Sequence, residues 1–151
     1  RGLANELHPT MLEDFGLAAA IREYIADVNL PEEEPLQVTV QADDVEEQLP
    51  NEAKLTIFRI TQEALRNIRR HAGAKNVQIA FVQEHAGVSV MIKDDGRGFN
   101  PDQPHPGHFG LQYMRERAEA CGGIFQVVST QGQGTEVRVN FPGASGNNQS
   151  P

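Results

Sequence analysis

The sequence predicts an α+β fold, a two-layer sandwich in which helices cover one face of a mixed, mostly antiparallel sheet. Three segments carry apolar residues at helical spacing, and five shorter segments alternate apolar and polar residues with a period of two. Four of these five strand segments come as two pairs, each joined by a short turn that contains glycine. A chain of 151 residues is long enough to bury one core of this kind.

The first predicted helix covers residues 9–28, and residues 36–41 form the first predicted strand. Gly16 lies in the middle of the helical segment, and glycine is a poor helix former, so the segment forms either one helix or two shorter ones. An acidic turn at residues 31–35 ends it. The apolar positions of the segment are Leu12, Phe15, Leu17, Ala20, Ile21 and Ile25.

The central part of the chain predicts a long helix over residues 50–71, which Gly73 ends. Residues 77–82 and 88–92 then alternate as two strands around the short turn at residues 85–87, which predicts a hairpin. The apolar stripe of the long helix comprises Leu55, Phe58, Leu65 and Ile68.

The C-terminal part begins with an irregular loop, residues 100–109, which is rich in proline. A third helix is predicted over residues 109–121, followed by two glycines. Two more strands, residues 125–129 and 135–141, lie on either side of the turn at residues 132–134.

These elements place a single domain at residues 9–141. Residues 1–8 are expected to be the end of a linker, and residues 142–151 are small and polar, which predicts disorder. Because the chain opens on Arg1 rather than on Met, and in mid-pattern, we expect it to be a piece of a longer protein.

The formal net charge of −8 argues against a general nucleic-acid binder, because no basic surplus is present to neutralise phosphates. An anionic ligand would have to be held locally, by backbone amides, a few arginines or a metal ion. Cys121 is the single cysteine, so it excludes an internal disulfide, fits a reducing compartment and is interpreted as a packing residue. No apolar run reaches the roughly 18 residues that a membrane span needs.

A polar line runs along the long predicted helix. Glu63, Asn67 and His71 are four residues apart, so they lie on one helical face, away from the apolar stripe. Magnesium prefers oxygen ligands and takes few of them from protein, which suits one carboxylate and one carboxamide. By spacing alone, the line is also compatible with a solvated helix face.

A second candidate site follows the strand at residues 88–92. Asp94 and Asp95 precede Gly96, Arg97 and Gly98, so an acid stands at the end of a strand beside glycines that allow a ligand to approach the backbone. Neither the Rossmann nor the P-loop spacing of glycines is present. The alternative interpretation is a tight turn, since Asp-Gly pairs are common in turns.

Two further glycine segments complete the set of candidate motifs. Residues 107–111 (GHFGL) lead into the third helix, and free amides at a helix N-terminus form an anion site. Residues 132–135 (GQGT) join the last two strands. In isolation, the first is also compatible with a flexible loop and the second with an ordinary hairpin turn.

Taken in order, the four segments resemble the ATP-binding domain of sensor histidine kinases, which has the Bergerat fold of the GHKL superfamily. Residues 62–73 (QEALRNIRRHAG) look like its N box, residues 94–99 (DDGRGF) like its G1 box and residues 107–111 like its G2 box. Residues 132–135 look like its closing glycine-threonine turn. The amino-acid sequence of the N box, together with residues 114–118 (MRERA), resembles that of the nitrate-sensor and degradation-sensor branch. The resemblance covers residues 6–141.

The resemblance implies roles for individual residues. Asp94 would accept a hydrogen bond from the adenine amino group, Asn67 would ligate the Mg²⁺ that bridges the phosphates, and Glu63 would reach the metal or its waters. Glu63 and Asn67 are therefore the expected catalytic residues. Arg70 and His71 stand at phosphate-facing positions, and Thr135 would hydrogen-bond near the adenine end. The remaining expected pocket and lid residues are Gly96, Gly98, Gly107, Gly110 and Leu111.

His8 departs from the family pattern. Residues 5–9 (NELHP) are close to the motif that carries the phosphoacceptor histidine in this branch, but they lead straight into the first domain helix. We therefore expect the acceptor to lie upstream of this chain. His71, His105 and His108 also suggest a zinc site, but no cysteine or acid stands at ligand spacing with them, so this hypothesis is not favoured.

The leading hypothesis is thus the catalytic and ATP-binding domain of a two-component sensor kinase, with ATP and Mg²⁺ as cofactors. Its expected partners are its own absent dimerisation domain and a response regulator, with no nucleic acid and no membrane contact by this domain. We expect a cytoplasmic domain in a homodimeric parent, whether or not that parent has a membrane anchor. The alternatives are an anti-sigma-factor serine kinase of the same superfamily and a degenerate nucleotide-binding interaction module.

Overall fold

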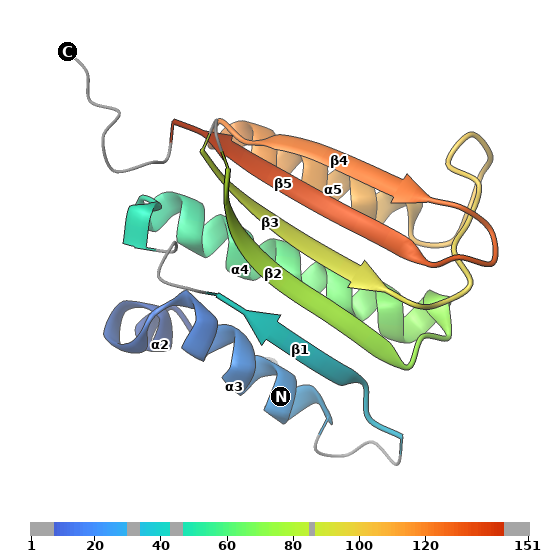
Figure 1. Ribbon diagram of the computed structural model, residues 1–151, viewed down its shortest axis with the longest axis horizontal. Coiled ribbons are helices and arrows are strands. Elements are labelled where there is room, and N and C mark those ends of the chain that lie inside the picture. The colour runs from blue at the N-terminus through green and yellow to red at the C-terminus, as the bar shows by residue number, and fades with distance from the viewer. Residues whose placement is uncertain (1–7, 30–33, 43–46, 85–86, 144–151) are drawn as a thin grey trace.

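The computed structural model describes residues 8–29, 34–42, 47–84 and 87–143. Within these residues five strands form one sheet in the order β1-β2-β3-β5-β4 (Figure 1). The strands are β1 (Gln37–Gln41), β2 (Asn76–Glu84), β3 (Gly87–Asp94), β4 (Ile124–Ser129) and β5 (Thr135–Pro142).

The helices lie against one face of this sheet, which confirms the predicted two-layer arrangement. In Figure 1, α4 and α5 lie behind the strands, and α3 packs beside α4 and β1 at one edge. The helical elements are α2 (His8–Phe15), α3 (Leu17–Asn29), α4 (Asn51–Asn67), the π-helix η2 (Ile68–Ala72) and α5 (His108–Ala120).

The sheet is mixed but mostly antiparallel, as predicted. β2 pairs with β3, β3 with β5 and β5 with β4 in antiparallel fashion, and only the β1–β2 pair among these strands is parallel. The connection between β1 and β2 contains α4 and η2, as a crossover between parallel strands requires. The β4 and β5 strands form the second predicted hairpin.

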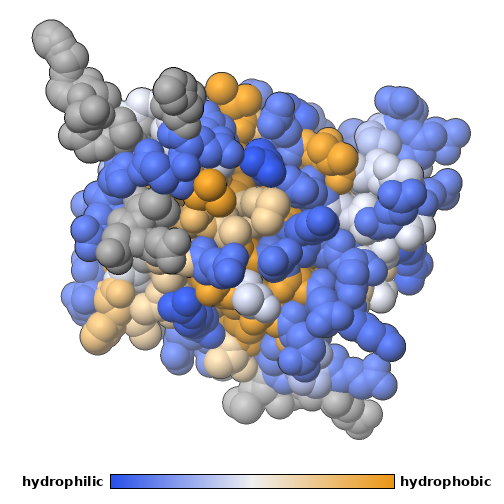
Figure 2. Space-filling view, viewed as in Figure 1, coloured by the Kyte–Doolittle hydropathy of each residue, from blue (hydrophilic) through white to orange (hydrophobic). Residues whose placement is uncertain are grey.

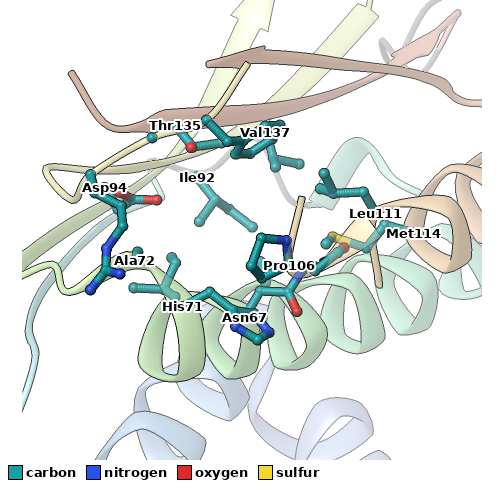
Figure 3. A pocket seen from close by; sticks show the side chains of 16 residues that line it. Asn67, His71, Ala72, Ile92, Asp94, Pro106, Leu111, Met114, Thr135 and Val137 are labelled. Carbon is teal, nitrogen blue, oxygen red and sulfur yellow. Dashed lines mark hydrogen bonds between the residues drawn. The ribbon is translucent and has the colours of Figure 1, made fainter. Parts of the chain in front are cut away.

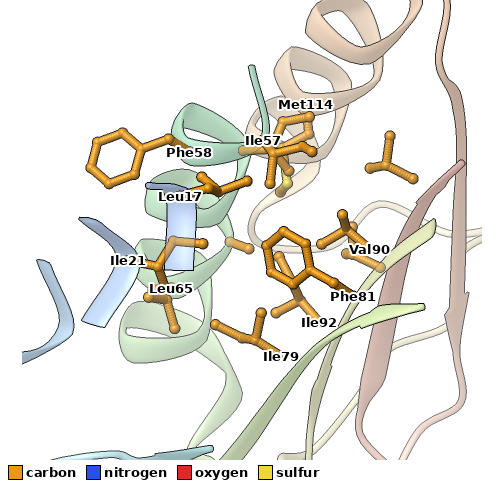
Figure 4. Close-up of a cluster of buried hydrophobic side chains, with 14 of the residues drawn as sticks. Leu17, Ile21, Ile57, Phe58, Leu65, Ile79, Phe81, Val90, Ile92 and Met114 are labelled. Carbon is orange, nitrogen blue, oxygen red and sulfur yellow. The ribbon is translucent and has the colours of Figure 1, made fainter. Parts of the chain in front are cut away.

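The core lies between the sheet and the helices (Figure 4). Alternate residues of the central strands point inward, for example Val88, Val90 and Ile92 of β3, each at most 3% exposed. From the other layer α4 contributes Phe58 and Leu65, which are equally buried. Of the stripe predicted for the long helix, Phe58, Leu65 and Ile68 are buried and Leu55 is partly buried against the core.

Gly16 divides the first helical segment into α2 and α3. Its φ of 96° is left-handed, and its amide and carbonyl still hydrogen-bond to Leu12 and Ala20. The helix direction changes at this point, so Phe15 is 68% exposed while Leu17 is fully buried. Of the apolar positions of this segment, Phe15 therefore does not join the core.

The long predicted helix changes its winding before it ends. Residues 51–67 are α-helical, but Ile68–Ala72 form the wider π-helix η2. The spacing of apolar residues in the sequence does not reveal this change. Gly73 then ends the segment, as predicted. The carbonyl of Ala72 accepts a hydrogen bond from the Arg97 amide at 2.8 Å, so the end of η2 is joined to the loop that follows β3. A π-helix at this position is in keeping with the frequent occurrence of such turns at functional sites.

Asp95 joins the end of β3 to the start of β2. Its carboxylate accepts hydrogen bonds from the backbone amides of Asn76 (3.0 Å) and Lys75 (2.9 Å) and from the Asn76 side chain (2.9 Å). Hydrogen bonds from Asn76 and Lys75 lower the pKa of Asp95 from 3.8 to about 2. The carboxyl group therefore stabilises the fold when it is ionised.

Replacing Asp95 with alanine is expected to lower the free energy of unfolding near neutral pH by about 1 kcal/mol, a modest value because the group is exposed. The folded-state pKa is depressed, so this stabilisation is present above pH 3.8 and is lost as the pH falls through about 2. Urea unfolding of wild type and Asp95→Ala along a pH series should show that their difference in the free energy of unfolding becomes smaller in acid. A difference that did not depend on pH would contradict this role of Asp95. Asp102→Ala, in an exposed loop, is the control.

The other face of the sheet carries mainly polar side chains. Figure 2 shows hydrophilic residues around a smaller apolar area on the face that Figure 1 presents. A hydrogen-bonded chain of Asn140, Ser89, Glu84 and Arg138 lies here, with Ser89 only 1% exposed. None of the described helices is both long enough and apolar enough to cross a bilayer.

Most of the predicted linker and tail falls outside the described residues. This applies to residues 1–7 of the linker and to residues 144–151 of the tail. The α2 helix begins at His8, and β5 extends to Pro142, one residue beyond the predicted domain boundary.

Candidate functional site

A pocket lies between the sheet, the end of α4 with η2, and the start of α5 (Figure 3). It holds about 690 Å³ of space, its open mouth included. Its lining residues are Ala64, Asn67, Ile68, His71, Ala72, Ile92, Asp94, Arg97, Gly98, Phe99, Pro106, Gly107, Leu111, Met114, Thr135 and Val137. Segments far apart in the sequence therefore meet at one cavity.

Strand periodicity places Asp94 in this pocket. Asp94 follows Val90 and Ile92 at two-residue steps on the inward face of β3, so its side chain points toward the helices although it is acidic. It is 5% exposed and accepts a hydrogen bond from the Gly96 amide at 2.7 Å. An acceptor at the end of an otherwise apolar strand face is well suited to recognise one polar edge of a flat ligand.

Burial determines the titration of Asp94. Desolvation raises the pKa of Asp94 above its ordinary value of 3.8, the backbone amides of Gly96 and Thr135 lower it, and the neighbouring Asp95 raises it again. Perturbed carboxyl groups in clefts are frequent at functional sites.

Thr135 lies directly opposite Asp94 on β5. The two residues are cross-strand partners in the β3–β5 register, so both side chains point to the same face of the sheet. Figure 3 shows them together at one end of the pocket. The Thr135 hydroxyl lies 2.7 Å from the hydroxyl of Ser129, the last residue of β4.

The helical wall opposite the sheet carries Asn67 and His71. Both line the pocket together with Ala64, Ile68 and Ala72, at spacings of three and four residues along α4 and η2. The small and apolar neighbours leave room in front of the two polar side chains. Of the predicted polar line, Asn67 and His71 thus line the pocket, while Glu63 is outside its lining.

The start of α5 packs directly onto this polar line. The Asn67 side chain donates a long hydrogen bond, 3.5 Å, to the Gly107 carbonyl. A Cβ on Gly110 would lie 2.6 Å from Glu63 Oε2 and 2.9 Å from Asn67 Oδ1, closer than real contacts allow. A larger residue at position 110 would therefore displace the ends of these two side chains. Among the described residues no side chain caps the N-terminus of α5, so backbone amides at that end remain for a ligand.

The donor types at this end of α4 fit a magnesium ion. Glu63 and Asn67 stand one turn apart and each presents a side-chain oxygen toward Gly110, and carboxylate and carboxamide oxygens are the hard donors that Mg²⁺ prefers. The other Glu63 oxygen pairs with Arg66. Two protein oxygens would leave the remaining positions to water and phosphate, as is usual for this ion.

Four predicted residues lie outside the pocket lining: Glu63 and Gly110, described above, and Arg70 and Gly96. Arg70 is exposed on η2, and its phosphate-facing role stays a prediction. Gly96 allows the loop after β3 to pack on η2, since a Cβ there would lie 2.4 Å from the Ala72 carbonyl oxygen. Of the other predicted pocket glycines, Gly98 and Gly107 line the cavity.

The apolar walls were missed by the motif reasoning. Ile92 and Val137 line the pocket from β3 and β5, and Met114 lines it from α5, one turn after Leu111. Their signal was in the sequence, since Ile92 and Val137 stand two residues from Asp94 and Thr135 on the same strand faces. Motifs of polar and glycine residues do not draw attention to such positions.

His105 and His108, in and at the end of the predicted lid loop at residues 100–109, form aromatic contacts. The ring of His105 stacks on Phe99 at 3.9 Å between centroids, and the His108 ring meets that of His105 edge-on at 5.6 Å. In the part of the chain that the structure describes, no three His, Cys, Asp or Glu side chains are grouped so that they could hold a metal ion. Phe99 thus links the loop after β3 to the lid.

The chain is similar to a known family of ATPases. Residues 52–145 match the family described as Histidine kinase-, DNA gyrase B-, and HSP90-like ATPase. This range contains all of the pocket residues described above.

Similar full-length proteins are sensor kinases. The chain is 34% identical to the sensor protein VraS of Staphylococcus epidermidis over 142 residues, which cover 94% of this chain and 40% of VraS. It is 31% identical to the sensor histidine kinase LiaS of Bacillus subtilis, covering 94% of this chain and 38% of LiaS. The chain therefore spans about two fifths of the length of these relatives.

A solved structure shares the fold. The blue-light activated histidine kinase of Erythrobacter litoralis superposes with a TM-score of 0.67 at 28% identity, over 83% of this chain and 41% of that protein.

Proposed function

Because the chain belongs to the family of histidine kinase-, DNA gyrase B- and HSP90-like ATPases, we propose that it is the ATP-binding catalytic domain of a sensor histidine kinase. The observation that carries this proposal is the buried Asp94 at the end of β3, an acceptor at the end of an apolar pocket. The similar proteins VraS and LiaS are named as sensor kinases, which supports the histidine kinase over the anti-sigma-factor serine kinase.

The adenine base would bind between the two layers. Its 6-amino group would donate to the Asp94 carboxylate, and its ring would lie among Ile92, Leu111, Met114 and Val137. A carboxylate that accepts but does not donate favours an amino group over the carbonyl of guanine at this position. The apolar walls supply the burial that a flat base requires.

The phosphates would lie toward α4 and the start of α5. Asn67 and Glu63 would hold Mg²⁺, which neutralises phosphate charge when it is bound, and His71 faces the same cavity. The uncapped N-terminus of α5 adds backbone amides and the favourable end of a helix dipole. This arrangement positions a triphosphate without a P-loop.

The proposed reaction is phosphoryl transfer to histidine. An imidazole nitrogen of the acceptor would attack the γ-phosphorus, the bond to the β–γ bridging oxygen would break, and ADP would leave with the electron pair. The acceptor's N–H proton passes to solvent. Positioning and charge neutralisation supply most of the catalysis in such reactions.

The acceptor is proposed to lie on a dimerisation domain outside this chain. His8 begins α2, which is followed after Gly16 by α3 of the same domain, and this supports the expectation that His8 is not the acceptor. A response regulator would then receive the phosphoryl group. We place the domain in the cytoplasm, in a homodimeric parent.

The experiment that tests this function is calorimetry of the chain with ADP, with and without Mg²⁺. The wild-type chain should bind ADP more tightly with Mg²⁺, and Asn67→Ala should remove that gain, an expected loss of about tenfold in affinity, or about 1.4 kcal/mol. Asn140→Ala, on the other face of the sheet, should behave as wild type.

Two outcomes would contradict the proposal. Absence of ADP binding by the folded wild-type chain would favour the degenerate interaction module. If the chain with γ-labelled ATP labelled a supplied anti-sigma antagonist on serine, and left a supplied dimerisation domain of a similar kinase unlabelled, the serine kinase would be the correct assignment.

A further inference from the structure

The hydroxyl of Ser129 is the meeting point of three segments beside the pocket. It accepts a hydrogen bond from the Phe99 amide at 2.9 Å, lies 2.7 Å from the Thr135 hydroxyl and lies 3.2 Å from the Gly134 carbonyl. Ser129 is 8% exposed and does not line the pocket itself. It therefore acts on the site only through its neighbours.

Counting protons determines the direction of these hydrogen bonds. A serine hydroxyl has one proton to donate and can accept two hydrogen bonds. The Phe99 amide can only donate and the Gly134 carbonyl can only accept. The arrangement that makes all three contacts hydrogen bonds therefore sends the Ser129 proton to Gly134 and the Thr135 proton to Ser129. The lone pairs of the Thr135 hydroxyl are left for the pocket, which Thr135 lines.

We propose that Ser129 is a positioning residue that holds the Thr135 hydroxyl as a hydrogen-bond acceptor toward the pocket and thereby sharpens selection for a purine with a 6-amino group. This inference rests on the proposed ATP-binding function. Asp94 and Thr135 are direct cross-strand partners, so their side chains stand about 5 Å apart on one face. Two adjacent acceptors match an amino group, which has two protons, and they disfavour a 6-oxo group, which has none.

Without Ser129 the Thr135 hydroxyl would be free to rotate. It could then present its proton to the pocket and accept a 6-oxo purine as a partner. Selection would rest on Asp94 alone. The two acceptors together are thus expected to discriminate better than the carboxylate by itself.

The test compares ADP with inosine diphosphate, which has a 6-oxo group in place of the 6-amino group. Calorimetry should show that wild type prefers ADP, and that Ser129→Ala lowers the ADP-to-inosine-diphosphate preference by about tenfold, the loss of one hydrogen bond to the base edge. Thr135→Val should lower it by a similar factor. In the double variant the preference should be no lower than in Thr135→Val, because Ser129 acts through Thr135.

Ser89→Ala is the matched control. It also removes a buried, hydrogen-bonded serine hydroxyl, but on the other face of the sheet, so it should cost stability without changing the nucleotide preference. Ser129→Thr retains a hydroxyl and should keep the wild-type preference. If Ser129→Ala does not fold by thermal melting, Ser129→Cys, which donates and accepts weakly, replaces it and should lower the preference.

Three results would overturn the inference. If the folded Ser129 variant kept the wild-type preference for ADP over inosine diphosphate, Ser129 would have only a structural role. Additive losses in the double variant would mean that it acts through another group, such as Phe99. A preference lowered equally by Ser89→Ala would point to a general loss of order. If folded wild type bound neither nucleotide, the proposed function itself would fail, which is a separate and recognisable outcome.

Discussion

Replacing Asp94 with asparagine is expected to weaken nucleotide binding strongly and to leave the fold at least as stable. The introduced carboxamide would keep an oxygen for the Gly96 amide, so its NH₂ group would face the adenine amino group, donor against donor. Losing a hydrogen bond to a charged acceptor predicts an affinity loss of at least about thirtyfold, or about 2 kcal/mol. Calorimetry with ADP measures this loss.

The stability half of this prediction follows from the pKa of Asp94. Burial raises the pKa of Asp94 above 3.8, so the ionised form costs stability at pH values above the folded-state pKa. Asparagine removes that cost, and the gain should vanish below pH 3.8, where the carboxyl is protonated in both states. Urea unfolding at neutral and acid pH measures it.

Asp102→Asn is the control for the charge change, because Asp102 lies exposed in the loop before α5. It should change neither ADP affinity nor stability by more than a few tenths of a kcal/mol. If Asp94→Asn bound ADP as wild type does, the adenine end of the site would be wrongly assigned.

Replacing Gly98 with alanine is expected to be severely destabilising. Gly98 has a φ of +64°, and a Cβ there would lie 2.1 Å from the Thr130 carbonyl oxygen and 2.9 Å from that of Gly134. Both obstacles are backbone, so the loop after β3 and the β4–β5 turn must move apart. We expect a loss of more than about 3 kcal/mol in the free energy of unfolding, together with loss of ADP binding.

Gly132→Ala separates the two causes of this loss, which are the positive φ of the glycine and the clash of a Cβ with neighbouring backbone. Gly132 also has a positive φ, +84°, but among the described residues no other atom lies within 4 Å of the position of its Cβ. It should therefore show only the backbone strain, about 1–2 kcal/mol. Urea unfolding measures the loss in the free energy of unfolding for each variant. If the two losses were equal, the close approach of Thr130 and Gly134 to Gly98 would not be what makes glycine necessary there.

Much of the fold was predictable because it depends on local patterns. Two-residue alternation located all five strands, and helical spacing located the three helical regions. Gly16 was correctly recognised as a point where one helix could become two. The parallel pairing of β1 with β2 was not predicted, because it depends on which edge of the sheet a distant strand reaches.

The candidate site was predictable in its polar and glycine positions and less so elsewhere. Asn67, His71, Asp94 and Thr135 line one pocket, as the motif order had indicated. The motifs did not identify the apolar walls, and Arg70, which they included, is exposed outside the lining. Spacing places a residue on a face but cannot say how far along that face a cavity extends.

The sequence alone determined the fold class, the four motifs and the resemblance to ATP-binding kinase domains, since periodicity and motif order are local properties of the chain. Only the tertiary structure showed that Gly110 packs on Glu63 and Asn67, that the long helix ends in a π-turn, and that the Ser129 and Thr135 hydroxyls lie 2.7 Å apart. These features join residues from separate elements at hydrogen-bond or van der Waals distance. Such contacts exist only after the sheet has set its register and the helices have packed against it.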